Sequence, residues 1–355
     1  MPVTLDLSGV VLSQVTVAVS PLAELQACLH ALAEPDHHFG ARVWLERVGG
    51  GLSGGLRSDL RTFAPLWARR RSRVLLPLER PVDVPLDVEL ARVAAIPDGE
   101  FLASVAGTVH GASEAGDALL AGGEEAYVRA CDARSFTRGE LARRLVADPV
   151  AFRDDLLHLL GRCREEFFDA EWRHLAVRLG DEVTRITRQR PATPVDLLCI
   201  VSPGARAIGD TSTVRFDKLQ QLRLAPQHRP VLLVPTVLGR PHLIVRGEPP
   251  FPVVVQFPVL GQESPEHVVE VRRRLSVISD ANRLELCRHL VNEAITTTDL
   301  AHRTGMPVSQ VSRHLAKLRS VGLLTSERDG RHVHHRLDVA TLMQLGPQVI
   351  SSIVQ

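Results

Sequence analysis

The last quarter of the chain carries an ordered series of helix signals that few folds accommodate. Residues 281–293 place apolar side chains at helical spacing, and Asp280 just before them is a residue type that caps helix N-termini. A second, shorter helix is predicted after a threonine cap at 297–298. Gly305 then permits a tight turn, and a third helix begins with Pro307 in its first turn. A helix, a glycine-containing turn and another helix together make a helix-turn-helix unit.

Two short strands follow this unit. Residues 323–328 and 332–337 have strand composition and are separated by Asp329-Gly330, a strong hairpin-turn signal. They predict a two-stranded wing directly after the third helix. The chain then closes with an apolar segment at 338–354, whose composition suits packing between two copies of the chain.

Residues 276–337 resemble the winged helix-turn-helix domain of the ArsR/SmtB repressors. The resemblance rests on short motifs in a fixed order: SDANR at the start of a helix, DLA before the turn, VSRHLAKL in the third helix, VGLL before the wing, and DGR with RL inside it. It implies a homodimeric transcriptional repressor that binds an inverted repeat in double-stranded DNA. The recognition helix would be 307–321 and the wing 323–337, and two-fold symmetry would set the spacing of the half-sites.

The same resemblance assigns the DNA contacts. Polar side chains on the first turns of a recognition helix reach base edges in the major groove, and wing residues reach phosphates or the adjacent minor groove. Gln310 can pair bidentately with adenine and Arg313 with guanine, whereas the serines suit phosphates. The predicted DNA-binding residues are Ser309, Gln310, Ser312, Arg313, His314, Lys317, Arg328, Arg331 and His332.

No metal site or cofactor is expected in this chain, and the C-terminal segment lacks the ligand sets of the family's metal sensors. Arsenic and cadmium sensors of the family use cysteines where this chain has 296–298, three threonines, and hydroxyls are poor ligands for soft metals. Zinc and nickel sensors of the family use Asp and His pairs on the terminal helix, where residues 338–355 hold one Asp and no histidine. His332, His334 and His335 gather on the wing, and we favour packing or phosphate contact over metal binding for them.

For the first three quarters of the chain, the sequence predicts a region that contains both helices and strands. Helical spacing dominates at first, and Ser20 caps a helix that has proline in its first turn. The glycine-rich stretch 49–55 is expected to be a loop. Later segments are short, rich in Val, Ile and Phe, and separated by Pro and Gly, which predicts a small antiparallel sheet. The predicted fold class is α+β, with an N-terminal region at 1–262, helical over 1–190 and strand-rich over 194–259, and a winged helix-turn-helix domain with a C-terminal dimerisation helix at 263–355.

The N-terminal region leaves several functions open. Through SPL near its start and the strands LLVPT, PHLIV and FPVVVQFPV, it resembles the long region of unassigned function that precedes such a domain in regulators of high-GC (actinobacterial) bacteria. We expect it to bind a small organic effector or to extend the dimer surface. The alternative is an enzyme or a protein-interaction module tethered to DNA. If the region is an interaction module, the three consecutive arginines at 69–71 would suit an acidic partner.

Catalytic residues are not expected in this region. G-x-S-x-G and H-E-x-x-H do not occur in the sequence. The tight polar group Asp36-His37-His38 is better explained as a turn that links helices than as a catalytic cluster. The chain is therefore predicted not to be an enzyme.

Composition narrows the class of protein further. Hydrophobic residues make up 45% and charged residues 23%, as in ordinary folded domains, and no run approaches 18 apolar residues. The start lacks signal-peptide features, so we expect a cytoplasmic protein without a membrane partner. The five cysteines form no C-x-x-C, and Cys287 is expected in the core. Residues 265–355 hold 12 Lys and Arg against 9 Asp and Glu, which permits an anionic partner.

Overall fold

The computed structural model divides into two compact units, Met1–Val259 and Leu260–Val354. Each unit has a hydrophobic core of its own. The structure describes residues 3–353 except 36–37, 39–40, 112–120, 122, 203, 210–211, 217–221, 260–264, 292 and 330–331. Among these residues no helix is both long enough and apolar enough to cross a membrane.

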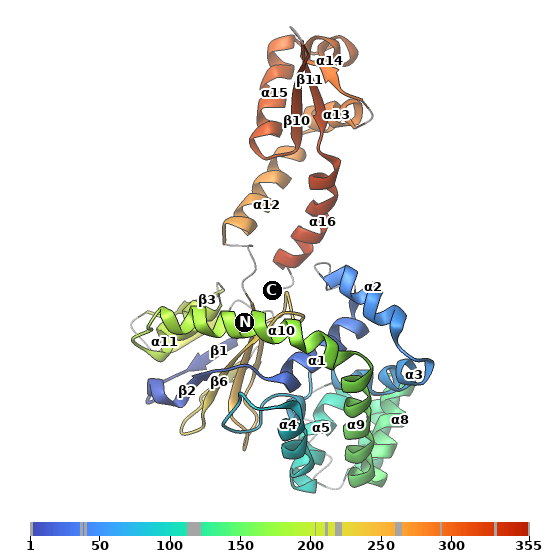
Figure 1. Cartoon of the computed structure of the whole chain (residues 1–355), viewed down its shortest axis with the longest axis vertical. Coiled ribbons are helices and arrows are strands. Elements are labelled where there is room, and N and C mark those ends of the chain that lie inside the picture. Colours follow the sequence, from blue (N-terminus) through green and yellow to red (C-terminus); the bar gives the residue numbers. More distant parts are fainter. Residues whose placement is uncertain are drawn as a thin grey trace. The chain divides into compact units, whose positions relative to one another are not determined.

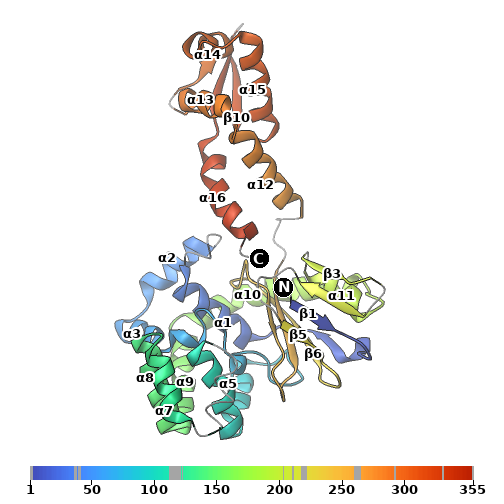
Figure 2. The same cartoon turned by 180° about the vertical axis from the view of Figure 1, so that it is seen from behind.

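Helices form the larger part of the N-terminal unit (Figure 1). The predicted cap of the first helix is confirmed, because the Ser20 hydroxyl accepts a hydrogen bond from the Ala23 amide at 3.1 Å. Figure 2 shows α5, α7, α8 and α9 packed together. The rings of Phe101 on α5 and Phe152 on α9 are fully buried in the core of this unit. The helices are α1 (Pro21–Ala33), α2 (Arg42–Gly51), α3 (Gly54–Phe63), α4 (Leu86–Ala94), α5 (Asp98–His110), α7 (Glu124–Asp132), α8 (Phe136–Ala147), α9 (Pro149–Cys163), α10 (Asp169–Arg188) and α11 (Pro194–Val201).

Two four-stranded sheets complete this unit. One has the order β2-β6-β8-β7, in which β2 (Val15–Val17), β6 (Val231–Thr236) and β8 (Val253–Pro258) run parallel and β7 (Ile244–Arg246) is antiparallel. The other has the order β3-β4-β1-β5, built from β1 (Val3–Asp6), β3 (Ala205–Ala207), β4 (Thr213–Phe216) and β5 (Leu222–Leu224). All six residues of β6 are buried, as expected for a strand covered on both faces.

The α+β class and its antiparallel pairs are confirmed, and the structure adds parallel pairs that the sequence did not reveal. The strands β1 and β2 lie within the first 190 residues, where only helices were expected, and they pair with strands beyond residue 220. The later, strand-rich segment therefore supplies only some of the strands in each sheet.

Two local predictions are wrong for identifiable reasons. Residues 195–201 lie at the start of the segment 194–259 that was expected to be strand-rich, but they form α11, because Thr193 and Asp196 make a capping box and Pro194 occupies the first helical position. The stretch 49–55 was expected as a loop, yet α2 runs to Gly51 and α3 starts at Gly54. Ser53 separates the two helices, and its hydroxyl accepts a hydrogen bond from the Leu56 amide that starts α3.

The C-terminal unit has the predicted order of helices and strands. Its three-stranded sheet has the order β10-β11-β9, and the core includes the fully buried Leu286, Leu300 and Leu323 together with Cys287, as predicted. Helices α12 and α16 pack against each other (Figure 1). The elements are α12 (Pro265–Ile278), α13 (Ala281–Leu290), β9 (Ile295–Thr296), α14 (Thr297–Thr304), α15 (Val308–Ser320), β10 (Leu324–Asp329), β11 (His332–Leu337) and α16 (Val339–Ile353).

Candidate nucleic-acid interface

The turn between α14 and α15 is fixed by one cap and one glycine. Thr296 caps α14 by accepting a hydrogen bond from the Asp299 amide at 3.2 Å, so the cap lies one residue before the predicted pair 297–298. The Thr296 hydroxyl also donates to the Asp299 carboxylate at 2.7 Å. Gly305 ends the helix with φ of +68°, the left-handed conformation that glycine adopts without strain. These contacts set the direction in which α15 leaves the turn.

Helix α15 has one buried side and one polar side. Val311, Leu315 and Leu318 are at most 1% exposed and lie in the core of the unit. The other side carries most of the polar residues expected to contact DNA. Of these, Ser309, Ser312, Arg313 and Lys317 are exposed, and Gln310 and His314 are half-buried.

Arg313 and Lys317 are two of the cationic residues on this side of α15. Within the described part of the chain neither side chain forms a salt bridge, so both are available to an anionic ligand. Burial lowers the pKa of His314, and the nearby Arg283 lowers it further while Asp280 raises it. His314 is therefore neutral at pH 7 and offers hydrogen bonds there, not charge.

The wing is a regular hairpin, and only part of its predicted contact set can be described. Strand β10 pairs antiparallel with β11, and Arg328 lies opposite Val333 and is exposed. Arg331 lies outside the described residues. The backbone of His332 belongs to β11, but its side chain is outside the described residues.

A hydrogen-bonded group joins the wing to α14 and α15. His335 is 3% exposed, and its Nε2 lies 3.1 Å from the Thr297 hydroxyl. Its Nδ1 lies 2.9 Å from the Ser326 hydroxyl, which in turn accepts a hydrogen bond from Arg319 at 3.0 Å. The packing role that the sequence favoured thus holds for His335. The contact with His335 also gives a structural role to Thr297, one of the three threonines at 296–298.

The sequence analysis missed Arg319 and the role of Arg283. Arg319 lies seven residues after Ser312, two helical turns along the same side, and that spacing was the available signal. Arg283 is buried, and its guanidinium donates to the Val277 carbonyl at the end of α12. The SDANR motif is therefore structural here: Asp280 caps α13 and Arg283 ties α13 to α12.

Comparisons with known proteins divide the chain close to the boundary between its two units. Residues 1–263 match a family of unknown function (DUF5937), and residues 278–327 match a helix-turn-helix domain. The HTH-type transcriptional regulator KmtR of Mycobacterium tuberculosis is 38% identical over 78 residues, which is 22% of this chain and 58% of KmtR. The nodulation protein NolR of Rhizobium meliloti is 34% identical over 61 residues, or 17% of this chain and 50% of NolR. The chain thus spans about half the length of these two relatives.

This chain covers a larger share of a third relative. The HTH-type transcriptional regulator NmtR of Mycobacterium tuberculosis is 33% identical over 81 residues, which is 23% of this chain and 68% of NmtR. Among solved structures, a homodimeric winged helix-turn-helix DNA-binding domain from Mycobacterium bovis, described as a possible ArsR-family regulator, is 26% identical with a TM-score of 0.22. That match covers 26% of this chain and 88% of the other.

Proposed function

Since this chain belongs over residues 1–263 to a family of unknown function (DUF5937), and since its C-terminal unit is a winged helix-turn-helix domain, we propose that it regulates transcription by binding double-stranded DNA. The observation that carries the proposal is the polar side of α15. Exposed serines and the side chains of Arg313 and Lys317, which form no salt bridge with the residues that the structure describes, lie on a helix whose other side is fixed in the core. A helix of this kind fits the major groove, where base edges can be distinguished.

Individual contacts follow from the chemistry of each side chain. Arg313 reads guanine through two hydrogen bonds and Gln310 reads adenine, while Ser309, Ser312 and Lys317 bind phosphates and His314 adds a neutral hydrogen bond. On the wing, Arg328, Arg331 and His332 contact phosphates or the adjacent minor groove. The group around His335 holds the wing in register with α15, so both elements reach the duplex together.

The chain acts as a homodimer through α12 and α16. These packed helices expose large apolar side chains that a monomer leaves in water: Val269 at 66%, Leu275 at 39%, Val339 at 37% and Met343 at 74%. Pairing of this surface with a second copy around a two-fold axis places two α15 helices on one duplex. The operator is then an inverted repeat whose half-sites lie about one helical turn, roughly 34 Å, apart.

The N-terminal region, residues 1–262, regulates this DNA binding. Its extensive core makes it an independent folded unit large enough to bind an effector, and a small organic molecule is the class that the sequence suggested. Release of DNA on effector binding would make the chain a repressor.

The direct test is selection of bound fragments from the source genome with purified full-length protein. We expect an inverted repeat, and gel shifts on it should weaken as salt rises, because phosphate contacts release counterions. Recovery of no preferred sequence, together with equal binding to unrelated duplexes, would refute sequence-specific regulation.

A further inference from the structure

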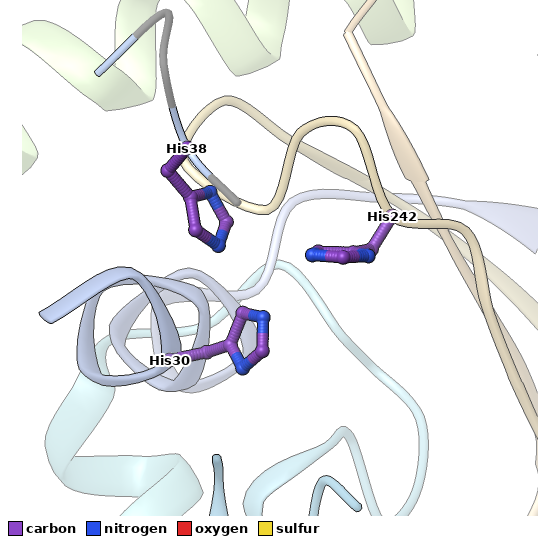
Figure 3. Close-up of side chains that lie close together, drawn as sticks. All are labelled: His30, His38 and His242. Atoms are coloured by element: carbon purple, nitrogen blue, oxygen red, sulfur yellow. The ribbon is translucent and has the colours of Figure 1, made fainter. Parts of the chain in front are cut away.

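Three histidines from separate segments meet inside the N-terminal unit (Figure 3). His30 lies in the last turn of α1, His38 follows α1, and His242 lies between β6 and β7. Their ring centroids are 4.9 to 5.3 Å apart, and one nitrogen from each ring lies within 4.8 Å of the others. His30 is 5% exposed and His38 2% exposed, whereas His242 is half-buried.

The hydrogen bonding of His30 sets its tautomer. Its Nδ1 lies 2.8 Å from the Trp67 carbonyl oxygen, which can only accept, so Nδ1 carries the proton. The lone pair is then on Nε2. This atom is buried and has no hydrogen-bond partner among the described residues. Histidines that bind metals are oriented in the same way, with the remote nitrogen donating to a carbonyl or carboxylate.

The surroundings of His30 are largely buried. Burial lowers the pKa of His30 to about 2, and the neighbouring Arg71 and His38 add to the effect, while the carbonyls of Trp67 and Ala68 oppose it. Arg71 is itself buried and lies near the carboxylate of Glu24.

The fold holds the segment of His242 against the helix of His30. Glu24 lies on α1, and its carboxylate accepts hydrogen bonds from the amides of Val237, at 3.1 Å, and Leu238, at 2.9 Å. These amides come directly after β6, at the carboxyl end of a parallel strand. This edge of a parallel sheet is where α/β folds commonly place ligand sites.

We propose that His30, His38 and His242 bind one divalent transition-metal ion of the zinc class. Imidazole nitrogens suit Zn²⁺, Ni²⁺ and Cu²⁺, whereas Ca²⁺ and Mg²⁺ require oxygen ligands. Nitrogens that bind zinc tetrahedrally with bonds of about 2.0–2.1 Å lie about 3.3 Å from each other. The three histidine nitrogens lie within 4.8 Å of one another, so the largest distance between them must shorten by somewhat more than about 1 Å when the ion binds. His38 and His242 lie outside helices and strands, in segments that are not fixed by a helix or a strand ladder.

This site goes beyond the proposed function and does not depend on it. The sequence analysis treated 36–38 as a turn between helices, and of these residues His38 lies within the described part of the chain. DNA binding by α15 uses neither His30 nor His242. Failure of metal binding and failure of DNA binding are therefore separate results.

The test uses full-length protein freed of metal by chelator and then dialysed against Zn²⁺ or Co²⁺. We expect one ion per chain by elemental analysis, and a Co²⁺ visible spectrum of nitrogen coordination without thiolate charge-transfer absorption. His30→Gln and His242→Gln should each weaken Zn²⁺ binding by about 100-fold or more, since losing a ligand costs more than the 10- to 100-fold typical of an outer-shell partner. The matched control is His158→Gln, an exposed histidine on α9 of the same unit, which should bind as the wild type does.

Three results would overturn the proposal. The first is absence of Zn²⁺ and Co²⁺ binding by the wild type. The second is unchanged affinity in His242→Gln, a half-buried position outside helices and strands that keeps the test decisive if His30→Gln does not fold. The third is loss of the ion in His332→Gln/His334→Gln with retention in His242→Gln, which would assign the metal to the wing.

Discussion

Replacing Arg313 with alanine tests whether α15 reads bases. Arg313 is exposed and forms no salt bridge within the described residues, so its removal should leave the stability of the C-terminal unit unchanged. A bidentate arginine–guanine contact is worth about 1–3 kcal/mol, which corresponds to about a 5- to 150-fold loss of affinity. Because the contact is to one base pair, the loss should be confined to operators that carry the preferred base.

The assay is fluorescence anisotropy with the selected operator and with every single-base variant of one half-site. Wild-type protein should discriminate at the position read by Arg313, and Arg313→Ala should bind all four bases there with similar affinity. Arg288→Ala is the matched control, since Arg288 is an exposed arginine on α13 that pairs with Glu285 at 3.0 Å. An equal loss on every sequence, with a salt slope reduced by about 0.9, would show that Arg313 contacts a phosphate and would refute the assignment.

Three further predictions concern stability and assembly. Burial raises the pKa of Glu89 to about 7, so the folded chain binds more protons than the unfolded chain between about pH 4.5 and 7. The unfolding free energy of the chain should therefore fall by about 3 kcal/mol as pH rises through that window. In urea titrations Glu89→Gln should lack this dependence of the unfolding free energy on pH, and an equal dependence in the variant would show that Glu89 is not its cause. Gly305→Ala should destabilise the C-terminal unit by about 1–2 kcal/mol from backbone strain alone, because no atom lies within 4 Å of the added carbon. Hydrogen exchange of α14 and α15 measures this, since all three tryptophans lie in the other unit, and Gly180→Ala, within α10 and equally open, should show no such loss. Met343→Glu should weaken the dimer about 10-fold or more in sedimentation experiments, because it buries an unpaired charge, and an unchanged dimer would place the interface elsewhere.

The C-terminal unit was predictable because its signals are local. Asp280, Gly305 and the hairpin turn each act within a few residues, and the apolar spacing of α15 identified its buried side without any knowledge of partners. The cap at Thr296 differs by one residue because three consecutive threonines have the same chemistry. The hydrogen bonds of His335 involve α14, α15 and β10, so no sequence spacing could indicate them.

The N-terminal unit was less predictable because its decisive contacts are distant in sequence. Val15 pairs with Val231, and nothing near either residue indicates that β2 joins a parallel sheet. His30 and His242 are likewise brought together only by the packing of α1 against the segment after β6. At 195–201 the strand-rich composition was misleading because of a local signal. The cap at Thr193 outweighed the β-branched residues that follow it, and the segment is a helix.

The pairing of β2 with β6 also sets an order for events during synthesis. Strand β2 leaves the ribosome long before residues 231–236 are made. Strand β6 is then paired along both edges only after β8 has also been made. The helices of the N-terminal unit can collapse earlier, but the sheet closes only once about 258 residues have been made. The C-terminal unit pairs strands separated by a few dozen residues at most, so it can mature soon after its own last residue emerges. A nascent chain truncated near residue 230 should therefore depend on chaperones, because β2 then lacks its partner β6 and stays unpaired.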